Sequence, residues 1–390
     1  RSGTLYPRWM ADSFDGLGSP AFYFYPPLPF WVDAAVSVVT ANVMPVSYRL
    51  VVTSVLILFA SGLAMRAWLQ SQAHSPRAAL WGAVAYMAGP YHLLDFYVRG
   101  AFAEFTAFVF LPLVLLFLRR PVWLAVVYAG LLLSHLPSAL LVSVTLLPAY
   151  ALALAPTPRE LARMLAGGAL GIGLAALYVA PALTLQDWIS AQQLWMPFYH
   201  VDRWFLLTPS RWPEPYIMNV LCWFAAAYAL AMAGLLATFR RRFWPLVCLA
   251  CLALVAGVVP WFWQLPELAK VQFPWRLLLV VEFAAVTALA PGKGFSGSRR
   301  PARDSLIAED STSIALSWPK TTRLRSVVRL SSTLLSSDDT VLGGMRAIVA
   351  MTASISLGVI VFLRLEGTTS ICIAPTSSIT SIALSGSLRS

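Results

Sequence analysis

The sequence predicts an all-α fold, a polytopic transmembrane helical bundle of about nine to eleven spans. Of its 390 residues, 59% are hydrophobic and only 12% are charged, well below the roughly 25% that is usual in soluble domains. The apolar residues form continuous runs rather than alternating ones, which favours helices over a closed barrel. Lys and Arg gather in alternate connections between the runs, as is typical of cytoplasmic loops.

Apolar runs of about 20 residues, the length that crosses the hydrocarbon core of a bilayer, follow one another along most of the chain. The predicted spans are 48–69, 78–96, 103–118, 121–136, 138–155, 163–184, 215–238, 243–263 and 274–291. The earlier stretch 28–45 is apolar but contains Asp33, Asn42 and Pro45, and is therefore either a span or a helix lying at the interface.

The chain divides into three regions. Residues 1–47 form a first external loop with a candidate interfacial helix, and 48–291 form the transmembrane domain, which includes an external loop at 185–214. Residues 292–390 form a Ser-rich tail with a weak candidate span at 345–363. The tail is either disordered or translated out of frame, and we favour the second interpretation. Because the chain starts at Arg1, inside a loop and without Met, we expect a fragment that lacks its first span.

Charge distribution predicts the orientation of the bundle. The basic connections include Arg119 with Arg120 and the run from Arg240 to Arg242, and these are assigned to the cytoplasm. The opposite connections are longer, richer in aromatic residues, and hold most of the acidic residues. We therefore expect any chemistry at the outer face. The net charge of +11 is spread in small groups without a basic stripe, so nucleic acid is excluded as a partner and membrane lipids are favoured.

Two acidic residues mark the first external loop. Asp12 and Asp15 lie three residues apart, so that in a helical turn they share one side and could hold a divalent metal ion or act as a general base. Arg8 nearby could bind a phosphate. The alternative is a hydrated loop with ordinary acids and turn-forming Gly and Pro.

Charged residues also surround two predicted outer hairpins. Asp95 and Glu104 flank Arg99, which predicts either a structural ion pair or an arginine that binds a lipid phosphate. In the second hairpin His135 lies between Ser134 and Ser138, where a polar turn that lines a cavity is a better interpretation than a nucleophile, because Pro137 breaks the helix.

The last predicted span opens with a basic residue. Arg276 at a helix N-terminus has the wrong sign for the helix dipole, so its partner is predicted to be an anion such as a phosphate, unless its side chain reaches the interface beside Trp275. Glu282 lies deeper in the same span. An ionisable group at that depth is either functional or held by a neighbouring helix.

The order of these motifs resembles a bacterial membrane family named "6-pyruvoyl-tetrahydropterin synthase-related", over roughly residues 1–290. The resemblance rests on segments that carry the candidate residues: Leu5–Trp9, Phe24–Leu28, Pro90–Asp95, Arg99–Ala101 with Glu104, His135–Ser138 and Gln272–Arg276. The family looks like part of the GT-C group of polytopic glycosyltransferases, which implies a bacterial cytoplasmic (inner) membrane location and a sugar donor carried on a polyprenyl phosphate.

The resemblance implies roles for individual residues. Asp12 or Asp15 would act as the base or hold a divalent ion, and substrate or phosphate would be bound by a second set: Arg8, Arg99, Glu104, His135, Gln272 and Arg276. The aromatic outer loops, including Trp195, Tyr199, His200 and Trp204, would cover the sugar. The principal base of such an enzyme could lie in the first span or in the start of the first external loop, which we expect this fragment to lack, so its enzymatic activity is left open.

Two other classes of function remain open. A transporter or flippase for a lipid-linked solute would use Glu282 and the proline-interrupted spans near Pro112, Pro148 and Pro181. A non-catalytic protein of envelope assembly would keep its cellular role after replacement of the outer acids. The sequence has no Walker A loop, no GxGxxG after a strand and no HExxH, which argues against an ATP-driven pump.

Overall fold

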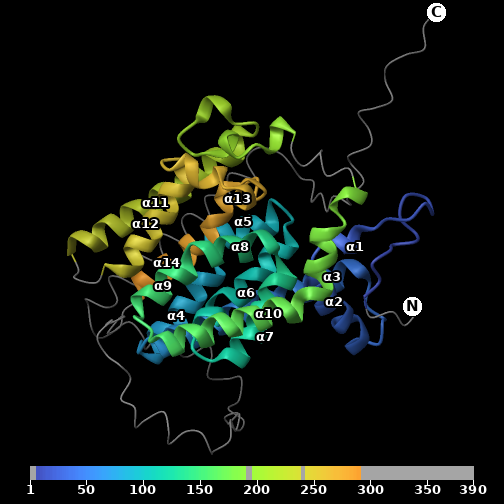
Figure 1. Ribbon diagram of the computed structural model, residues 1–390, viewed down its shortest axis with the longest axis horizontal. Coiled ribbons are helices and arrows are strands. Elements are labelled where there is room, and N and C mark those ends of the chain that lie inside the picture. The colour runs from blue at the N-terminus through green and yellow to red at the C-terminus, as the bar shows by residue number, and fades with distance from the viewer. Residues whose placement is uncertain (1–5, 190–195, 239–241, 291–390) are drawn as a thin grey trace, which may run out of the picture.

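The computed structural model describes residues 6–189, 196–238 and 242–290, and this part of the chain is all-α, as predicted (Figure 1). The α-helices are α1 (Ala21–Phe24), α2 (Leu28–Val39), α3 (Val46–Ser71), α4 (Pro76–Met87), α5 (Pro90–Tyr97), α6 (Phe102–Leu116), α7 (Pro121–Ser134), α8 (Leu136–Val144), α9 (Leu146–Ala153), α10 (Pro158–Thr184), α11 (Pro215–Thr238), α12 (Phe243–Ala256), α13 (Pro266–Ala269) and α14 (Leu278–Leu289). Short 3₁₀ turns are η1 (Gln186–Trp188), η3 (Pro197–Tyr199), η4 (Val201–Trp204), η5 (Pro209–Arg211), η6 (Pro260–Gln264) and η7 (Pro274–Leu277). The Ser-rich tail and the weak span at 345–363 lie outside the described residues.

Four helical segments in the described part are long and apolar enough to cross a membrane. They are Val46–Ser71, Leu136–Ala153 (α8 and α9 together), Pro158–Thr184 and Pro215–Thr238, with 26, 18, 27 and 24 residues. The prediction of about nine to eleven spans is therefore wrong for the residues described. Several of the expected spans are shorter apolar helices instead, among them α6, α7 and α12.

Proline and the residue before it explain one of these corrections. The expected span 78–96 is divided because Gly89 adopts ψ 132°, and Pro90 then starts a new helix, α5. The residue before a proline is disfavoured in the helical region, so a break at this point is expected. The break that we expected at Pro137 falls between α7 and α8, where His135 is extended with φ −160°. Pro90, which we included within an apolar run, instead divides that run into two helices.

The other corrections concern α12 and α14. Gly257 ends α12 in the left-handed conformation, with φ 83°, and a Cβ atom there would lie 2.5 Å from Cγ of Phe205. The expected span 274–291 begins instead with the 3₁₀ turn η7, so α14 has only 12 residues. At Gly257 a local backbone preference coincides with a tertiary contact, which hydropathy alone does not reveal.

The long helices carry large apolar side chains on their outer surfaces. Side chains more than half exposed include Val55 and Phe59 of α3, Leu165, Leu170 and Leu174 of α10, and Trp223 and Leu230 of α11. Contiguous apolar surface on this scale is costly in water and is suited to lipid. Together with their length, this makes the four segments typical of a multi-pass membrane protein.

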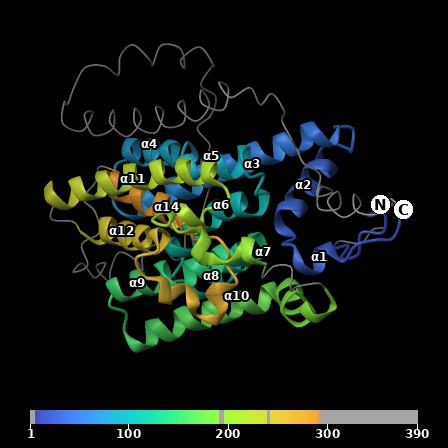
Figure 2. The same ribbon diagram turned by 90° about the horizontal axis from the view of Figure 1, so that it is seen from above.

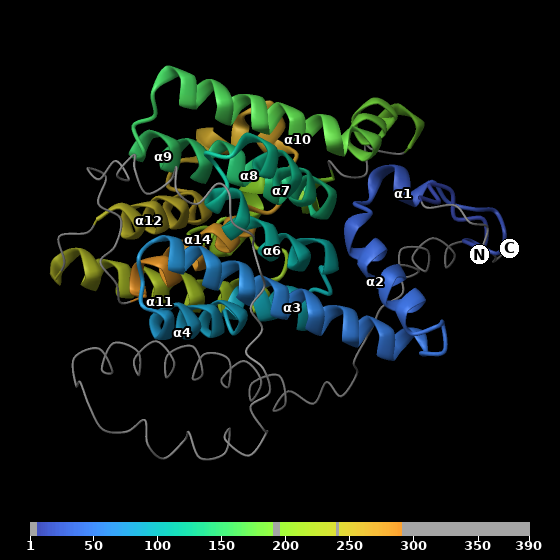
Figure 3. The ribbon, with the colours of Figure 1, turned by 90° about the horizontal axis from the view of Figure 1, so that it is seen from below.

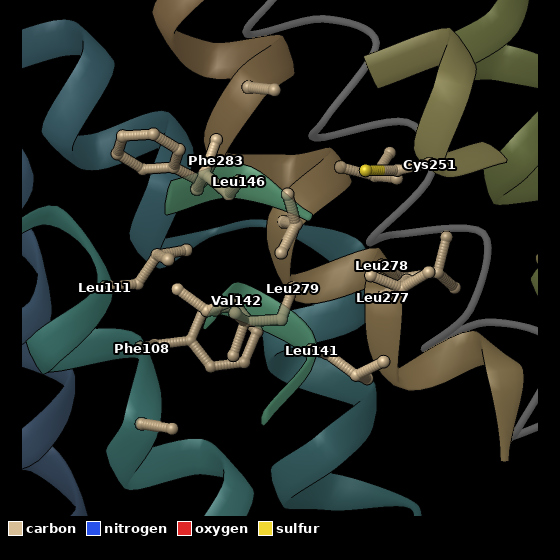
Figure 4. Packing of buried hydrophobic residues seen from close by; sticks show 14 of the residues in the cluster. Phe108, Leu111, Leu141, Val142, Leu146, Cys251, Leu277, Leu278, Leu279 and Phe283 are labelled. Atoms are coloured by element: carbon tan, nitrogen blue, oxygen red, sulfur yellow. The ribbon is translucent and has the colours of Figure 1, made fainter. Parts of the chain in front are cut away.

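Helix α14 lies at the centre of the bundle, and every residue from Leu278 to Thr287 is buried. It packs against α12, α11 and α4, while α6 and the α8–α9 pair complete the core. Figure 4 shows Leu279 and Phe283 of α14 among Phe108 of α6 and Val142 of α8. A helix whose side chains are apolar apart from Glu282 and Thr287 suits this central position.

The N-terminal helices α1 and α2 lie at one end of the bundle, beside α3 and the end of α10 (Figures 2 and 3). An ion pair fixes α2 on α3: Nε of Arg49 lies 2.8 Å from Oδ2 of Asp33, while the hydroxyl of Thr53 donates to Oδ1 at 3.1 Å. The acid that made 28–45 an ambiguous span is therefore turned toward α3.

Candidate functional site

The loop before α1 carries Asp12 and Asp15, which are both exposed. Backbone hydrogen bonds between Met10 and Ser19, at 2.8 and 3.0 Å, close the loop. Asp15 has φ 54°, so the pair does not lie on a helical turn as we expected. The loop projects away from the bundle in two perpendicular ribbon views (Figures 1 and 2). No ion pair or hydrogen bond among the described residues joins either side chain to the other candidate residues.

These two acids do not provide a metal site by themselves. A divalent cation such as Mg²⁺ or Ca²⁺ takes about six or more oxygen ligands, of which the protein commonly supplies several. The described residues include no group of three or more His, Cys, Asp or Glu side chains placed to hold a metal ion. We therefore derive no chemical step through a metal.

Arg8 anchors the same loop to α10. Its Nη2 donates to the carbonyl of Leu177 at 2.8 Å, and its guanidinium lies 5.2 Å from the ring centroid of Tyr6 and 5.5 Å from that of Tyr23. Nearby, the hydroxyl of Tyr178 donates to the carbonyl of Phe24. Among the described residues, these contacts place Arg8 apart from the other two candidate phosphate-binding arginines and give it a docking role.

The other candidate residues converge on Arg99, which lies between α5 and α6. Its Nη1 forms an ion pair with Asp95, lies 3.0 Å from Oε2 of Glu104, and donates to the hydroxyl of Tyr91 at 3.0 Å. Tyr91 in turn donates to Oε1 of Glu104 at 2.6 Å. Asp95, Glu104 and Tyr91 are almost completely buried. We call these four residues, together with Arg276, the arginine cluster.

Local sequence explains how the cluster forms. Asp95 and Arg99 are four residues apart at the end of α5, a spacing that brings side chains together on a helix. The amide of Ala101 donates to the carbonyl of Asp95 at 2.8 Å and turns the chain into α6. Glu104 then lies in the first turn of α6, where an acid also suits the helix dipole.

Arg276 reaches the cluster from the distant turn η7. Its Nε lies 3.4 Å from Oε2 of Glu104, its Nη1 donates to the carbonyl of Val271 at 2.6 Å, and its guanidinium lies 5.1 Å from the ring of Phe273. Gln272 has φ 69° and lies in the turn that leads to Arg276, with its side chain half-buried. The anion that we expected beside Arg276 is, in this structure, the carboxylate of Glu104.

His135 approaches the same acid from the break between α7 and α8. Its Nδ1 lies 2.8 Å from Oγ of Ser138, and it is close enough to Glu104 for their charges to interact. The histidine, which is 9% exposed, therefore lies at the edge of the arginine cluster. The contact between His135 and Ser138 is part of a polar turn beside the charges of the cluster.

Aromatic rings cover the cluster. The rings of Phe273 and Trp275 stack at 4.6 Å, and Trp204 of η4 meets Trp275 edge-on at 4.7 Å. Tyr199 of η3 packs on Phe273, and the guanidinium of Arg99 lies 6.0 Å from the ring of Trp275. Two of the aromatic residues expected to cover a sugar are thus close to the arginines, whereas Trp195 lies outside the described residues.

The pKa values of two groups outside the four long helices reflect this arrangement. Partial burial raises the pKa of the Tyr25 phenol, and the charges of Arg276 and Arg99 oppose that rise. Burial works to lower the pKa of Arg99, but Glu104 and Asp95 hold it well above its usual range. Arg99 therefore stays positively charged, and Tyr25, which no motif singled out as a site residue, lies within range of both arginines.

Glu282 has a different role from that of the cluster. Its carboxylate accepts hydrogen bonds from the backbone amides of Tyr91 and His92, at 2.6 and 3.1 Å, and from the hydroxyl of Tyr228 at 3.0 Å. The two amides belong to the first turn of α5, whose N–H groups have no partners within the helix. Of our two interpretations of Glu282, the structure favours a hydrogen bond to a neighbouring helix.

Comparisons with protein-family models, with curated proteins and with solved structures each find no match for this chain. The fold and the cluster thus define its class only broadly, as a helical protein with four long apolar helices that could be membrane spans.

Proposed function

We propose that this chain is a membrane glycosyltransferase of GT-C type that uses a sugar linked to a polyprenyl phosphate at the outer face of the membrane. The observation that supports the proposal is the pairing of Arg99 and Arg276 about one carboxylate, Glu104, under a cover of aromatic rings. Two arginines held in place beside aromatic rings suit a phosphate that is attached to a carbohydrate.

The hydrogen bonds of Arg99 leave part of its guanidinium for a ligand. A guanidinium has five N–H groups, and the bonds from Arg99 to Tyr91, Asp95 and Glu104 all start from Nη1. Within the described residues, Nη2 and Nε donate to none of these partners. The two acids therefore hold the arginine in place while its other nitrogens face a phosphate in our proposal.

The same two cations would assist bond cleavage. When the glycosidic bond of a sugar phosphate breaks, negative charge grows on the leaving phosphate, and positive groups fixed in advance stabilise that charge. Asp12 or Asp15 would supply the base in this scheme. Because both lie in the exposed loop, the proposal depends mainly on Arg99 and Arg276.

The rival proposal of a transporter drew on Glu282 as an ionisable group within the membrane, together with the proline-interrupted spans. Its three hydrogen bonds give that carboxylate a structural task instead. We therefore place transfer of the sugar ahead of transport of a lipid-linked solute.

A transfer assay tests the proposal. Membranes that contain the full-length protein are given polyprenyl phosphate carrying a labelled hexose, and label that passes to other acceptors is counted. We expect Arg99→Gln or Arg276→Gln to lower the rate about 100-fold or more, as for loss of one preorganised donor. The control is Arg211→Gln, which breaks only an exposed ion pair with Asp202 at 2.9 Å. Equal rates in all three variants would refute the proposal.

The same assay tests the two acids of the first loop. The double variant Asp12→Asn with Asp15→Asn should abolish transfer if either acid is the base. Unchanged transfer would remove both from the mechanism but leave the role of the arginines standing.

A further inference from the structure

Two buried polar atoms next to Arg99 have no hydrogen-bond partner within the described residues: Nε1 of Trp275 and Oδ2 of Asp95. Trp275 is 4% exposed and Asp95 is fully buried, so bulk water does not satisfy either atom. Other buried indoles in this protein are satisfied, since Trp204 donates to Phe198 and Trp263 donates to Leu254. Unpaired buried polar atoms are uncommon, and a pair of them at one site needs an explanation.

Both atoms belong to side chains that already contact Arg99. The other oxygen of Asp95, Oδ1, pairs with the guanidinium, and the ring of Trp275 lies 6.0 Å from it. The next residue, Arg276, also has an unpaired Nε, which lies 3.4 Å from Glu104 without forming a hydrogen bond. The free groups are therefore donors, from Trp275 and Arg276, together with one acceptor, from Asp95.

We propose that Trp275 and Asp95 bind the ligand together with Arg99, and that this ligand carries a phosphate and a neighbouring hydroxyl group, as a glycosyl phosphate does. The indole N–H donates to a phosphate oxygen, while Oδ2 of Asp95 accepts from a sugar hydroxyl. A bare phosphate satisfies only the donors, so it leaves the carboxylate oxygen unpaired. This inference rests on the proposed function and adds the residues that distinguish a glycosylated phosphate from a bare one.

Calorimetric titration of the purified full-length protein in detergent tests the proposal with two probes. One is farnesyl phosphate, and the other is farnesyl phosphate that carries a hexose on its phosphate. We expect the glycosylated probe to bind about tenfold more tightly, which corresponds to one added hydrogen bond to a charged group. We expect Trp275→Phe, which removes the indole N–H and keeps an aromatic ring, to weaken binding of both probes about tenfold.

The matched control is Trp263→Phe, because Trp263 is equally buried but donates to the carbonyl of Leu254 at 3.0 Å. This variant should lower the melting temperature of the ligand-free protein and leave the affinity for both probes unchanged. Trp275→Phe should leave the melting temperature of the ligand-free protein unchanged, because the indole N–H of Trp275 has no partner among the described residues to lose. It should weaken binding of both probes. If Trp275 had only a structural role, both variants would lower the melting temperature and leave the affinity for both probes unchanged.

The outcomes separate this inference from the proposed function. If both probes bind the native protein with equal affinity, or if Trp275→Phe binds them as the native protein does, the inference is overturned while a phosphate site at Arg99 stands. If neither probe binds the native protein, both proposals fail. Tighter binding of the glycosylated probe by the native protein, together with weaker binding of both probes by Trp275→Phe and unchanged binding by Trp263→Phe, supports the inference.

Discussion

The carboxylate of Glu282 in α14 accepts a hydrogen bond from the backbone amide of Tyr91 in α5 at 2.6 Å, across a separation of 191 residues. The carboxylate thus caps the N-terminus of the helix that carries Asp95 and leads to Arg99. The approach is close because residue 89 is glycine, and a Cβ atom there would lie 2.5 Å from Oε2 of Glu282.

Removal of this cap should destabilise the bundle. We expect Glu282→Ala to lower the free energy of unfolding by about 3 kcal/mol, because it leaves two buried amides and the hydroxyl of Tyr228 without an acceptor. Titration with SDS in mixed micelles measures the change. Glu267→Ala is the control, since its pair with Lys270 is exposed and should contribute little. A stability equal to that of the native protein in both variants would contradict this role.

The contact between α12 and Phe205 gives a second prediction. Gly257→Ala forces an L-residue into φ 83° and places its Cβ against the ring of Phe205. We expect a loss of about 2 kcal/mol or more in the free energy of unfolding. Gly168→Ala is the matched control, because that glycine is helical and has no atom within 4 Å of an added Cβ. It should be neutral or stabilising by up to about 1 kcal/mol.

The ion pair between α2 and α3 can be measured by a double-mutant cycle. Asp33→Ala leaves Arg49 without its carboxylate partner and Thr53 without one of its two acceptors. We expect each of Asp33→Ala and Arg49→Ala to cost about 1–2 kcal/mol, and the double variant to cost less than their sum. Additive losses would mean that the pair does not couple the two helices.

The position of Arg8 predicts which residues share a side of the membrane. Arg8 binds the C-terminal part of α10, at Leu177, whereas Arg159 lies at the start of this 27-residue helix. In a background without other cysteines, Asp12→Cys and Asp202→Cys should therefore react with an impermeant maleimide from the outer face, and Arg159→Cys only after permeabilisation. Labelling of Asp12→Cys and Arg159→Cys from the same side would refute this topology.

The sequence predicted the all-α class and the neighbourhood of Arg99 well. Both follow from local signals, namely hydropathy and the position of Arg99 between Asp95 and Glu104. It did not predict the true helix lengths, because the breaks at Gly89 and Gly257 depend on the distant residues Glu282 and Phe205 as well as on local backbone preference.

The remainder of the site could not be predicted from the spacing of residues in the sequence, because it also depends on contacts between distant segments. Trp275 and Arg276 meet the cluster only after α14 has packed in the centre of the bundle, and Tyr25 only after α1 has docked on α10. Conversely, the short spacing of Asp12 and Asp15 suggested a shared helical face that the left-handed conformation of Asp15 removes.

The cap on α5 also bears on how the chain assembles during synthesis. When the ribosome has completed only α10, the amides of Tyr91 and His92 still lack their carboxylate, and the indole of Trp68 lacks its acceptor, Thr287. The helices made first can therefore reach their final order only when α14, the last helix of the part that the structure describes, enters among them. A nascent chain arrested before residue 282 should leave α5 open to attack by a membrane protease.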